Sequence, residues 1–163
     1  MKGGFDTSPG IIEKIISGGQ TGADRAALDW AIASAVPHGG WCPRGRKAED
    51  GTIPERYTLT DSPSANYLQR TEWNARDADG TAVFTISPIF SGGSKRTVEF
   101  AARHCKPWIH LHSEMPDPSR KLMEFIKTNR ITILNVAGSR GSKEPGVAAF
   151  VVEVLSEAFN PLP

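Results

Sequence analysis

The sequence predicts an α/β protein, a three-layer α/β/α sandwich around a mainly parallel, doubly wound sheet of about five strands. Two observations predict this class. Apolar runs alternate with segments of helical periodicity along most of the chain, and three of the runs end in loops rich in glycine or serine. Right-handed crossovers between parallel strands bring such loops to one edge of the sheet, which is where ligands bind in this architecture.

The first element has the order strand, glycine loop, helix. Residues 11–17 are apolar and predict a strand, and the loop at 18–22 contains three glycines. Small and apolar residues then recur at helical spacing from Ala23 to Ser34, and Pro37 ends this helix. The free N–H groups of such a helix start can bind phosphate or another anion. The glycines are equally compatible with an ordinary tight turn, because the loop matches neither the dinucleotide fingerprint nor the P-loop motif.

The following segment predicts little regular structure. Residues 38–41 are expected to form a short second strand. Residues 42–63 show no sustained period and contain several prolines and glycines, which is typical of an ordered functional loop. A helix over residues 67–78 should follow, with Ser62 or Ser64 as its cap.

The second half of the chain repeats the strand and helix alternation three times. Its strands are nearly continuous apolar runs, which is typical of a parallel sheet covered on both faces. A second glycine loop follows the first of them, and a third loop of small residues follows the last. The expected strands are 81–87, 108–112 and 131–136, and the expected helices are 98–104, 119–127 with Asp117 as its cap, and 145–159.

The composition is that of an ordinary globular protein. The 163 residues predict one domain over residues 11–160, after a flexible lead-in at residues 1–10. The formal net charge of +1 favours neither a nucleic acid nor a membrane as partner. The sequence has no signal-peptide core, and Cys42 and Cys105 are expected to be buried free thiols. A cytoplasmic location is therefore expected.

Basic residues gather in the segments expected at the ligand edge. Segments 42–48, 91–97 and 138–143 contain seven Lys or Arg residues and no Asp or Glu. A solvated loop surface explains any one segment, but anion recognition needs N–H groups and guanidinium groups in one place. His110 and His112 share one strand face, yet no further ligand accompanies them, so we expect a packed or hydrogen-bonded pair and no resident metal.

Several motifs resemble the molybdenum cofactor carrier protein family. The resemblance covers nearly the whole chain after residue 10 and implies a Rossmann-like fold, usually oligomeric, that holds the molybdenum cofactor. This cofactor is a pterin with a phosphate and a dithiolene-bound oxomolybdenum group, and the implied role is its storage, protection or transfer without covalent turnover. The motifs are residues 18–24 (GGQTGAD), 40–46 (GWCPRGR), 48–51 (AEDG), 53–57 (IPERY), 69–74 (QRTEWN), 91–94 (SGGS) and the run from Asn135 to Gly146.

The resemblance also implies a homo-oligomer, a dimer or tetramer, with molybdoenzymes or cofactor-synthesis proteins as partners. The two glycine loops would receive the phosphate, and the arginines would neutralise or cover the ligand. Asp24 would face its own helix or a donor on the heterocycle. The residues expected to bind the ligand are Gly18, Gly19, Gln20, Thr21, Gly22, Asp24, Arg44, Arg46, Arg70, Ser91, Gly92, Gly93, Ser94, Lys95, Thr97, Gly138, Ser139 and Arg140.

A wider resemblance supplies an alternative function. The family is similar to the nucleotide-binding superfamily that includes the cytokinin-activating phosphoribohydrolases, once labelled lysine decarboxylases. This implies an enzyme that cleaves nucleoside monophosphates, in which Glu99 assists departure of the base and Arg70 orients the phosphate or ribose. The spacing from Gly92 to Glu99 matches, but residues 95–97 (KRT) replace the Gly-Thr found there, which favours the binder. A nucleotide-sensing module is the third alternative.

Overall fold

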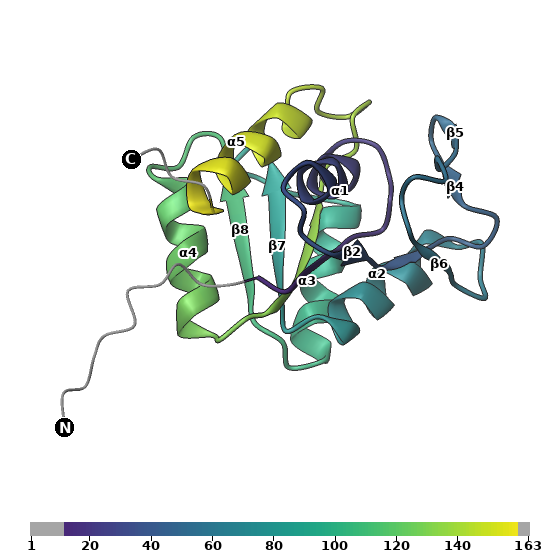
Figure 1. The fold of residues 1–163 in the computed structure, drawn as a ribbon, viewed down its shortest axis with the longest axis horizontal. Helices are drawn as coiled ribbons and strands as arrows, with labels where there is room; N and C mark the ends of the chain where they lie inside the picture. Colours follow the sequence, from purple (N-terminus) through teal and green to yellow (C-terminus); the bar gives the residue numbers. More distant parts are fainter. Residues whose placement is uncertain (1–11, 160–163) are drawn as a thin grey trace.

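The centre of the fold is a five-stranded parallel sheet with the order β2-β1-β9-β7-β8 (Figure 1). The computed structural model describes residues 12–159, so the lead-in expected at residues 1–10 lies outside the described residues. The expected fold class, a Rossmann-like α/β sandwich, is confirmed. The strands are β1 (Lys14–Ile16), β2 (His38–Gly39), β7 (Gly80–Thr85), β8 (Trp108–His112) and β9 (Ile133–Gly138).

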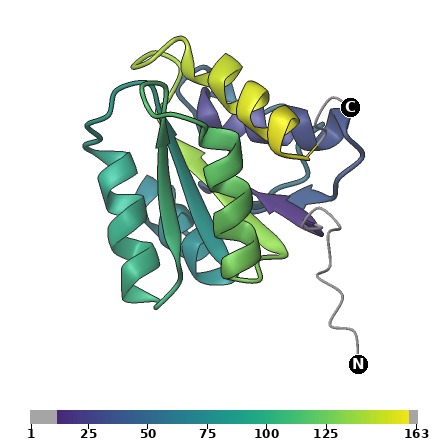
Figure 2. The ribbon, with the colours of Figure 1, turned by 90° about the vertical axis from the view of Figure 1, so that its left-hand side faces the viewer.

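Helices cover both faces of this sheet. In Figure 2 the teal helix α3 and the green helix α4 lie on opposite sides of the strands. Right-handed crossovers explain the division, because the chain crosses the sheet in one direction through α1 and α4 and in the other through α2 and α3. One layer contains α1 (Ala23–Ala33), α4 (Pro118–Thr128) and α5 (Val147–Phe159), and the other contains α2 (Tyr67–Asp77) and α3 (Gly93–Arg103).

The last strand of the chain lies in the middle of the sheet. β9 pairs with β1 on one side and with β7 on the other. If the strands are counted in a circle that begins at β9, the order from β2 to β8 becomes 3-2-1-4-5, which is the order of a doubly wound sheet. The direction of winding reverses between β9 and β7, and this reversal marks the expected ligand position.

Close packing between α1 and the sheet depends on small residues. Ala23, Ala27 and Ala31 are completely buried in the main core, against β9 and α5. At the end of β9, Gly138 has φ 153°, and a Cβ there would lie 2.0 Å from the carbonyl oxygen of Phe84. Glycine at this position therefore lets β9, β7 and α1 meet closely beside the ends of the strands.

Residues 42–63 form an ordered segment, as expected, and contain short strands that the sequence pattern did not predict. Ile53 and Tyr57 are fully buried and pack with Leu28 and Cys42 in a second hydrophobic cluster. Two strand pairs support this cluster. They are β3 (Trp41–Cys42) with β6 (Thr60–Asp61), which run parallel, and β4 (Lys47–Ala48) with β5 (Gly51–Thr52), which form an antiparallel hairpin.

The cap expected for α2 is wrong, whereas Asp117 is the N-cap residue of α4 as expected but does not cap it with its side chain. Asn66 caps α2, because its Oδ1 accepts a hydrogen bond from the backbone N–H of Leu68 at 2.9 Å. Ser62 instead donates to the carbonyl oxygen of Cys42. Asp117 does precede α4, but its backbone is left-handed and its side chain makes no capping hydrogen bond. Residue type alone does not show whether a polar side chain caps its helix or hydrogen-bonds elsewhere.

Two further expectations need correction. Helix α3 begins at Gly93, earlier than the expected residue 98, so its first turn is made by the second glycine loop itself. Cys42 is a buried free thiol as expected, but the free thiol of Cys105 is exposed. None of the described helices is long and apolar enough to cross a membrane.

Candidate functional site

A cleft of about 310 Å³ opens at the carboxyl ends of the central strands, beside the reversal between β9 and β7. Three loops surround it: the β1–α1 loop (17–22), the β7–α3 loop (86–92) and the β9–α5 loop (139–146). The first turn of α3 and one side of α2 complete it. The lining residues are Gly18, Gln20, Asp24, Arg70, Thr71, Asn74, Ser91, Gly92, Gly93, Ser94, Thr97, Asn135, Ala137, Gly138, Ser139, Arg140 and Lys143.

Most residues expected to bind a ligand line this one cleft. The first glycine loop contributes Gly18 and Gln20, the second contributes residues 91–94, and the third contributes residues 138–140. The remaining expected residues that line the cleft come from the starts of α1 and α3 and from α2. The expected residues that lie outside the cleft lining are Gly19, Thr21, Gly22, Arg44, Arg46 and Lys95.

A buried ion pair occupies the floor of the cleft beneath the first glycine loop. Arg70 Nη1 lies 2.8 Å from Asp24 Oδ2, and the two side chains are only 11% and 7% exposed. The backbone N–H of Gln20 donates to the same carboxylate oxygen. Burial raises the pKa of Asp24, and the charge of Arg70 opposes this rise. A Cβ on Gly18 would lie 1.5 Å from Arg70 Nη1, so only glycine admits the guanidinium here.

The rest of the first glycine loop packs against the β9–α5 loop. Gly22 has φ 82°, and a Cβ there would lie 2.4 Å from the carbonyl oxygen of Ser139. The next N–H, of Ala23, donates to that same carbonyl at 3.0 Å. Thr21 Oγ1 accepts a hydrogen bond from the N–H of Gly141 at 3.1 Å. Thr21 and Gly22 therefore join the β1–α1 loop to the β9–α5 loop.

The second glycine loop presents an open helix start to the cleft. Gly92 is the N-cap of α3 with φ 58°, and no side chain caps the helix there. Ser94 and Thr97 are buried and line the cleft, while a Cβ on Gly93 would meet no atom within 4 Å. An uncapped first turn combines free N–H groups with the positive end of the helix dipole. This is the part of the cleft best suited to a phosphate group.

Two basic side chains lie at the rim of the cleft. Lys143 Nζ lies 3.2 Å from Ser91 Oγ, which links the β9–α5 loop to the β7–α3 loop. Arg140 is about half exposed and lies 3.8 Å from a carboxylate oxygen of Glu49. Both cations can therefore approach an anion held at the start of α3.

The expected basic rim is smaller than the sequence suggested. Arg46 does not line the cleft, and its guanidinium donates to four backbone carbonyls of the 42–63 segment. Arg44 and Lys95 are exposed and do not line the cleft. Moreover, two acidic residues follow directly after segment 42–48: Glu49 contacts Thr21 of the β1–α1 loop, and Asp50 pairs with Arg25 of α1. Only Arg140 and Lys143 remain as basic groups at the rim from the three predicted segments.

Glu144 fixes the relative position of two cleft loops. Its two carboxylate oxygens accept hydrogen bonds from the N–H groups of Ile86 at 3.0 Å and Ser87 at 2.9 Å, and Ser139 Oγ donates to it as well. Burial alone would raise the pKa of Glu144, but these hydrogen bonds outweigh it and lower the pKa. The carboxylate thus ties the end of β7 to the start of the β9–α5 loop.

Several lining residues were not expected, although some have a sequence signal. Asn74 lies one helical turn after Arg70 and so shares its face of α2. Asn135 is a polar residue inside an apolar strand, where it donates to Thr81 Oγ1 at 3.2 Å. Lys143 belongs to the third basic segment. The unexpected lining residues are Thr71, Asn74, Asn135, Ala137 and Lys143.

The fold and the cleft define the class: a Rossmann-like α/β protein with an uncapped helix start at its topological switch point. Residues 15–159 match the circularly permutated YpsA SLOG family, and the chain belongs to this family. The central position of the last strand agrees with a circular permutation, because counting from β9 restores the usual order.

One solved structure supports the same assignment. The crystal structure of a protein from Syntrophus aciditrophicus, named "putative molybdenum carrier protein", matches with a TM-score of 0.89 and 42% sequence identity. The match covers 93% of this chain and 96% of that chain. A search of curated proteins found no match. The resemblance to the molybdenum cofactor carrier protein family is confirmed.

Proposed function

We propose that this protein is a carrier that binds a phosphorylated heterocycle, the molybdenum cofactor, without turning it over. The observation that supports this most is the uncapped start of α3, which faces the cleft with Gly92 and Gly93. The family assignment and the name of the structural neighbour favour the molybdenum cofactor among the ligands that carry a phosphate.

The phosphate would bind at the start of α3. Backbone N–H groups of residues 93–95 would donate to its oxygens, and the hydroxyls of Ser94 and Thr97 lie in the same wall of the cleft. Lys143, at the rim, would add a positive charge. In this proposal the first glycine loop does not hold the phosphate, because Arg70 and Asp24 already occupy the space beneath it.

The heterocycle would be recognised beside Gln20, whose amide has a defined orientation. Its Oε1 accepts hydrogen bonds from the N–H groups of Thr21 at 3.1 Å and Glu49 at 2.9 Å. Within residues 12–159, the buried Nε2 on the other side of the amide has no hydrogen-bond partner. A buried donor without a partner is costly, so a ligand acceptor would stabilise it. The carbonyl oxygen or a ring nitrogen of a pterin fits this requirement.

The molybdenum would enter this protein as part of its cargo, bound by the dithiolene of the cofactor. Storage, protection and delivery to molybdoenzymes or cofactor-synthesis proteins belong to the same proposal, as do a homo-oligomeric assembly and a cytoplasmic location. Light scattering on the purified protein would measure the assembly.

The alternative function as a phosphoribohydrolase has less support from the geometry. Glu99 is exposed on α3, pairs with Arg96 at 3.4 Å and does not line the cleft. Arg70 does line the cleft, but its guanidinium is paired with Asp24. The two residues assigned to catalysis by the wider resemblance are therefore not brought together around one ligand position.

The test uses the full chain under anaerobic conditions with molybdenum cofactor released from a molybdoenzyme. We expect pterin and molybdenum to co-elute with the protein in gel filtration, and oxidation of the bound cofactor to slow. Lys143→Ala should weaken this retention, whereas Lys127→Ala on the distant helix α4 should not. A panel of nucleoside monophosphates should release no free base. Release of base, or failure to bind both the cofactor and its metal-free pterin precursor, would overturn the proposal.

A further inference from the structure

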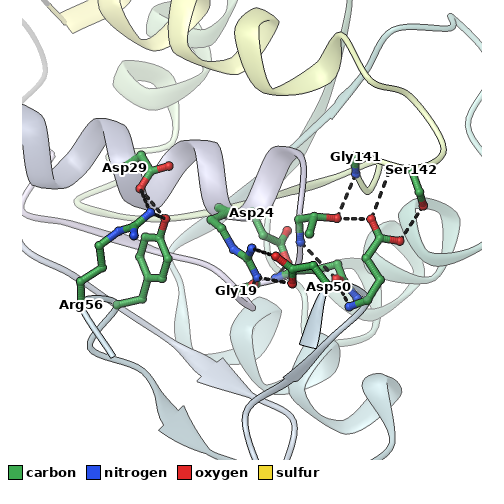
Figure 3. Close-up of polar contacts among 12 residues, drawn as sticks. Gly19, Asp24, Asp29, Asp50, Arg56, Gly141 and Ser142 are labelled. Atoms are coloured by element: carbon green, nitrogen blue, oxygen red, sulfur yellow. Dashed lines mark hydrogen bonds and ion pairs between the residues drawn. The ribbon is translucent and has the colours of Figure 1, made fainter. Parts of the chain in front are cut away.

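The β4–β5 hairpin reaches the cleft through one carboxylate at its tip. Glu49 Oε1 accepts hydrogen bonds from Thr21 Oγ1 and from the N–H of Ser142 at 3.1 Å, and Oε2 accepts one from Ser142 Oγ at 2.6 Å (Figure 3). Arg140 Nη1 lies 3.8 Å from Oε2. A single side chain from the hairpin therefore contacts both the β1–α1 loop and the β9–α5 loop.

The backbone of the same residue fixes the amide that faces the proposed ligand. The N–H of Glu49 donates to Gln20 Oε1, and this contact directs the unpartnered Nε2 of Gln20 to the other side. Thr21 Oγ1 also accepts from the N–H of Gly141, which closes a network across the two loops. Glu49 thus contacts both loops with its side chain and orients the Gln20 amide with its backbone.

The hairpin has a separate anchor that does not involve Glu49. Asp50 forms a two-contact ion pair with Arg25 of α1, with Nη1 2.5 Å from Oδ2 and Nη2 3.1 Å from Oδ1. Arg25 also donates to the carbonyl oxygen of Gly19. The next residue of the hairpin, Gly51, has φ 117°, and no atom lies within 4 Å of its Cβ position. Loss of the Glu49 carboxylate should therefore leave the hairpin in place.

We propose that Glu49 is a positioning residue for the ligand cleft, which holds the β9–α5 loop, with Arg140 and Lys143, in the arrangement that covers a bound anion. This inference rests on the proposed function for its ligand. A carboxylate is needed because its side chain accepts hydrogen bonds from two loops and also faces the Arg140 cation, whereas an amide at this position offers only one acceptor oxygen and no charge. The hydrogen bonds from Ser142 and Thr21 lower the pKa of Glu49, in agreement with an ionised acceptor.

The test compares Glu49→Gln with Glu55→Gln in the full chain. Glu55 is exposed in the same segment and, within residues 12–159, has no hydrogen bond or ion pair through its side chain, so its substitution removes the same charge without a contact. In the absence of ligand, the amide hydrogens of residues 139–143 should exchange faster in Glu49→Gln than in wild type, and they should exchange at the wild-type rate in Glu55→Gln. Dissociation of the molybdenum cofactor should become about tenfold faster, as expected for the loss of charged hydrogen bonds worth about 1.4 kcal/mol. Glu49→Asp should restore part of the slow dissociation.

The outcomes separate this inference from the proposed function. Unchanged exchange over residues 139–143, or unchanged cofactor dissociation despite faster exchange, would overturn the positioning role. A wild-type protein that binds no cofactor would overturn the proposed function, and the ligand-free exchange would then decide alone whether Glu49 holds the loop. If Glu49→Gln shows both faster exchange over residues 139–143 and faster cofactor dissociation, and Glu55→Gln shows neither, the results support the positioning role and the proposed function.

Discussion

Arg70 Nη1 lies 2.8 Å from Asp24 Oδ2 in the floor of the cleft, although 46 positions separate the two residues in the chain. Arg70 comes from α2 and Asp24 from the first turn of α1, so the pair also joins the two helix layers beside the sheet edge. A buried ion pair of this kind contributes little net stability, but each charge depends on the other. Substitutions of the two residues should therefore differ in a predictable way.

Removal of Asp24 alone should strongly destabilise the fold. Asp24→Ala leaves the Arg70 guanidinium buried without its counter-charge, for which a loss of about 3–5 kcal/mol is typical. Arg70→Met should cost less in acid, because Asp24 can take up a proton and its pKa is already raised by burial. Because the folded-state pKa is raised, the fold is favoured most below the unfolded pKa of about 3.9, so Arg70→Met should lose stability between about pH 4 and neutral pH. Urea unfolding at both pH values measures this, and a loss independent of pH would contradict it.

Gly18→Ala should act through Arg70. The added Cβ would lie 1.5 Å from Arg70 Nη1 and would force the guanidinium away from Asp24. In an Arg70→Ala background this collision is absent, so the same change should cost less there. A double-mutant cycle by urea unfolding should give a coupling energy of about 1 kcal/mol or more. Additive costs would show that Gly18 is needed for a different reason.

Gly93→Ala separates ligand binding from folding. Its Cβ would meet no atom within 4 Å, so the free energy of unfolding should stay unchanged or rise by about 0.4–1 kcal/mol. The extra methyl group would nevertheless occupy the cleft where the phosphate approaches the backbone. Cofactor affinity should therefore fall, measured by equilibrium binding. Gly146→Ala is the matched control, because Gly146 precedes α5 and lies outside the cleft lining. If Gly93→Ala and wild type bind the cofactor with equal affinity, the proposed position of the phosphate at the start of α3 is wrong.

Glu144→Gln should change the response of the protein to acid. The pKa of Glu144 is lowered in the fold, so its stabilisation is present above the unfolded value of about 4.3 and is lost as the pH falls through the folded pKa. The variant should have a lower Tm at neutral pH and a smaller further loss below about pH 4.3. Thermal unfolding across this pH range measures both effects. Glu124→Gln, which removes a carboxylate that is 68% exposed on α4, should behave like wild type.

Arg46→Gln should affect the 42–63 segment directly. The guanidinium of Arg46 donates to carbonyl groups of four residues, from Ile53 to Leu59, and their loss should cost about 1–3 kcal/mol. Hydrogen exchange over residues 42–63 should quicken in the absence of ligand, while Arg44→Gln, an exposed neighbour, should leave it unchanged. Wild-type exchange combined with lost cofactor affinity would instead support the direct ligand contact expected from the sequence.

The sequence predicted which loops form the cleft better than which atoms face it. Residues 18–22 and 91–97 were both expected at the ligand edge, because parallel strands end on the same side of a sheet. Yet Gly18 packs against the Arg70 guanidinium, Gly22 packs on the β9–α5 loop, and Gly93 leaves the start of α3 open to the cleft. The direction in which each loop residue faces depends on packing against distant segments. Local sequence composition carries no information about that packing.

The basic residues likewise show that the sequence predicts the loop but not the direction in which a side chain faces. Arg46 and Arg140 are both arginines in glycine-containing loops, and both were expected at the rim. Arg46 turns inward to backbone carbonyls, whereas Arg140 lies at the cleft near Glu49. A guanidinium has several donors that bind carbonyl groups as readily as anions, so its residue type cannot tell a structural role from a ligand role.

The sequence by itself determined the alternation of strands and helices, the α/β class and the glycine loops that follow the strands. These features depend on periodicity and on backbone freedom over a few consecutive residues, and both are properties of local sequence. Only the tertiary structure decided that β9 lies between β1 and β7, that Arg70 reaches Asp24, and that Glu49 joins two cleft loops. Each of these relationships joins segments far apart in the chain, and the free energy of such contacts exists only once the sheet has placed those segments side by side.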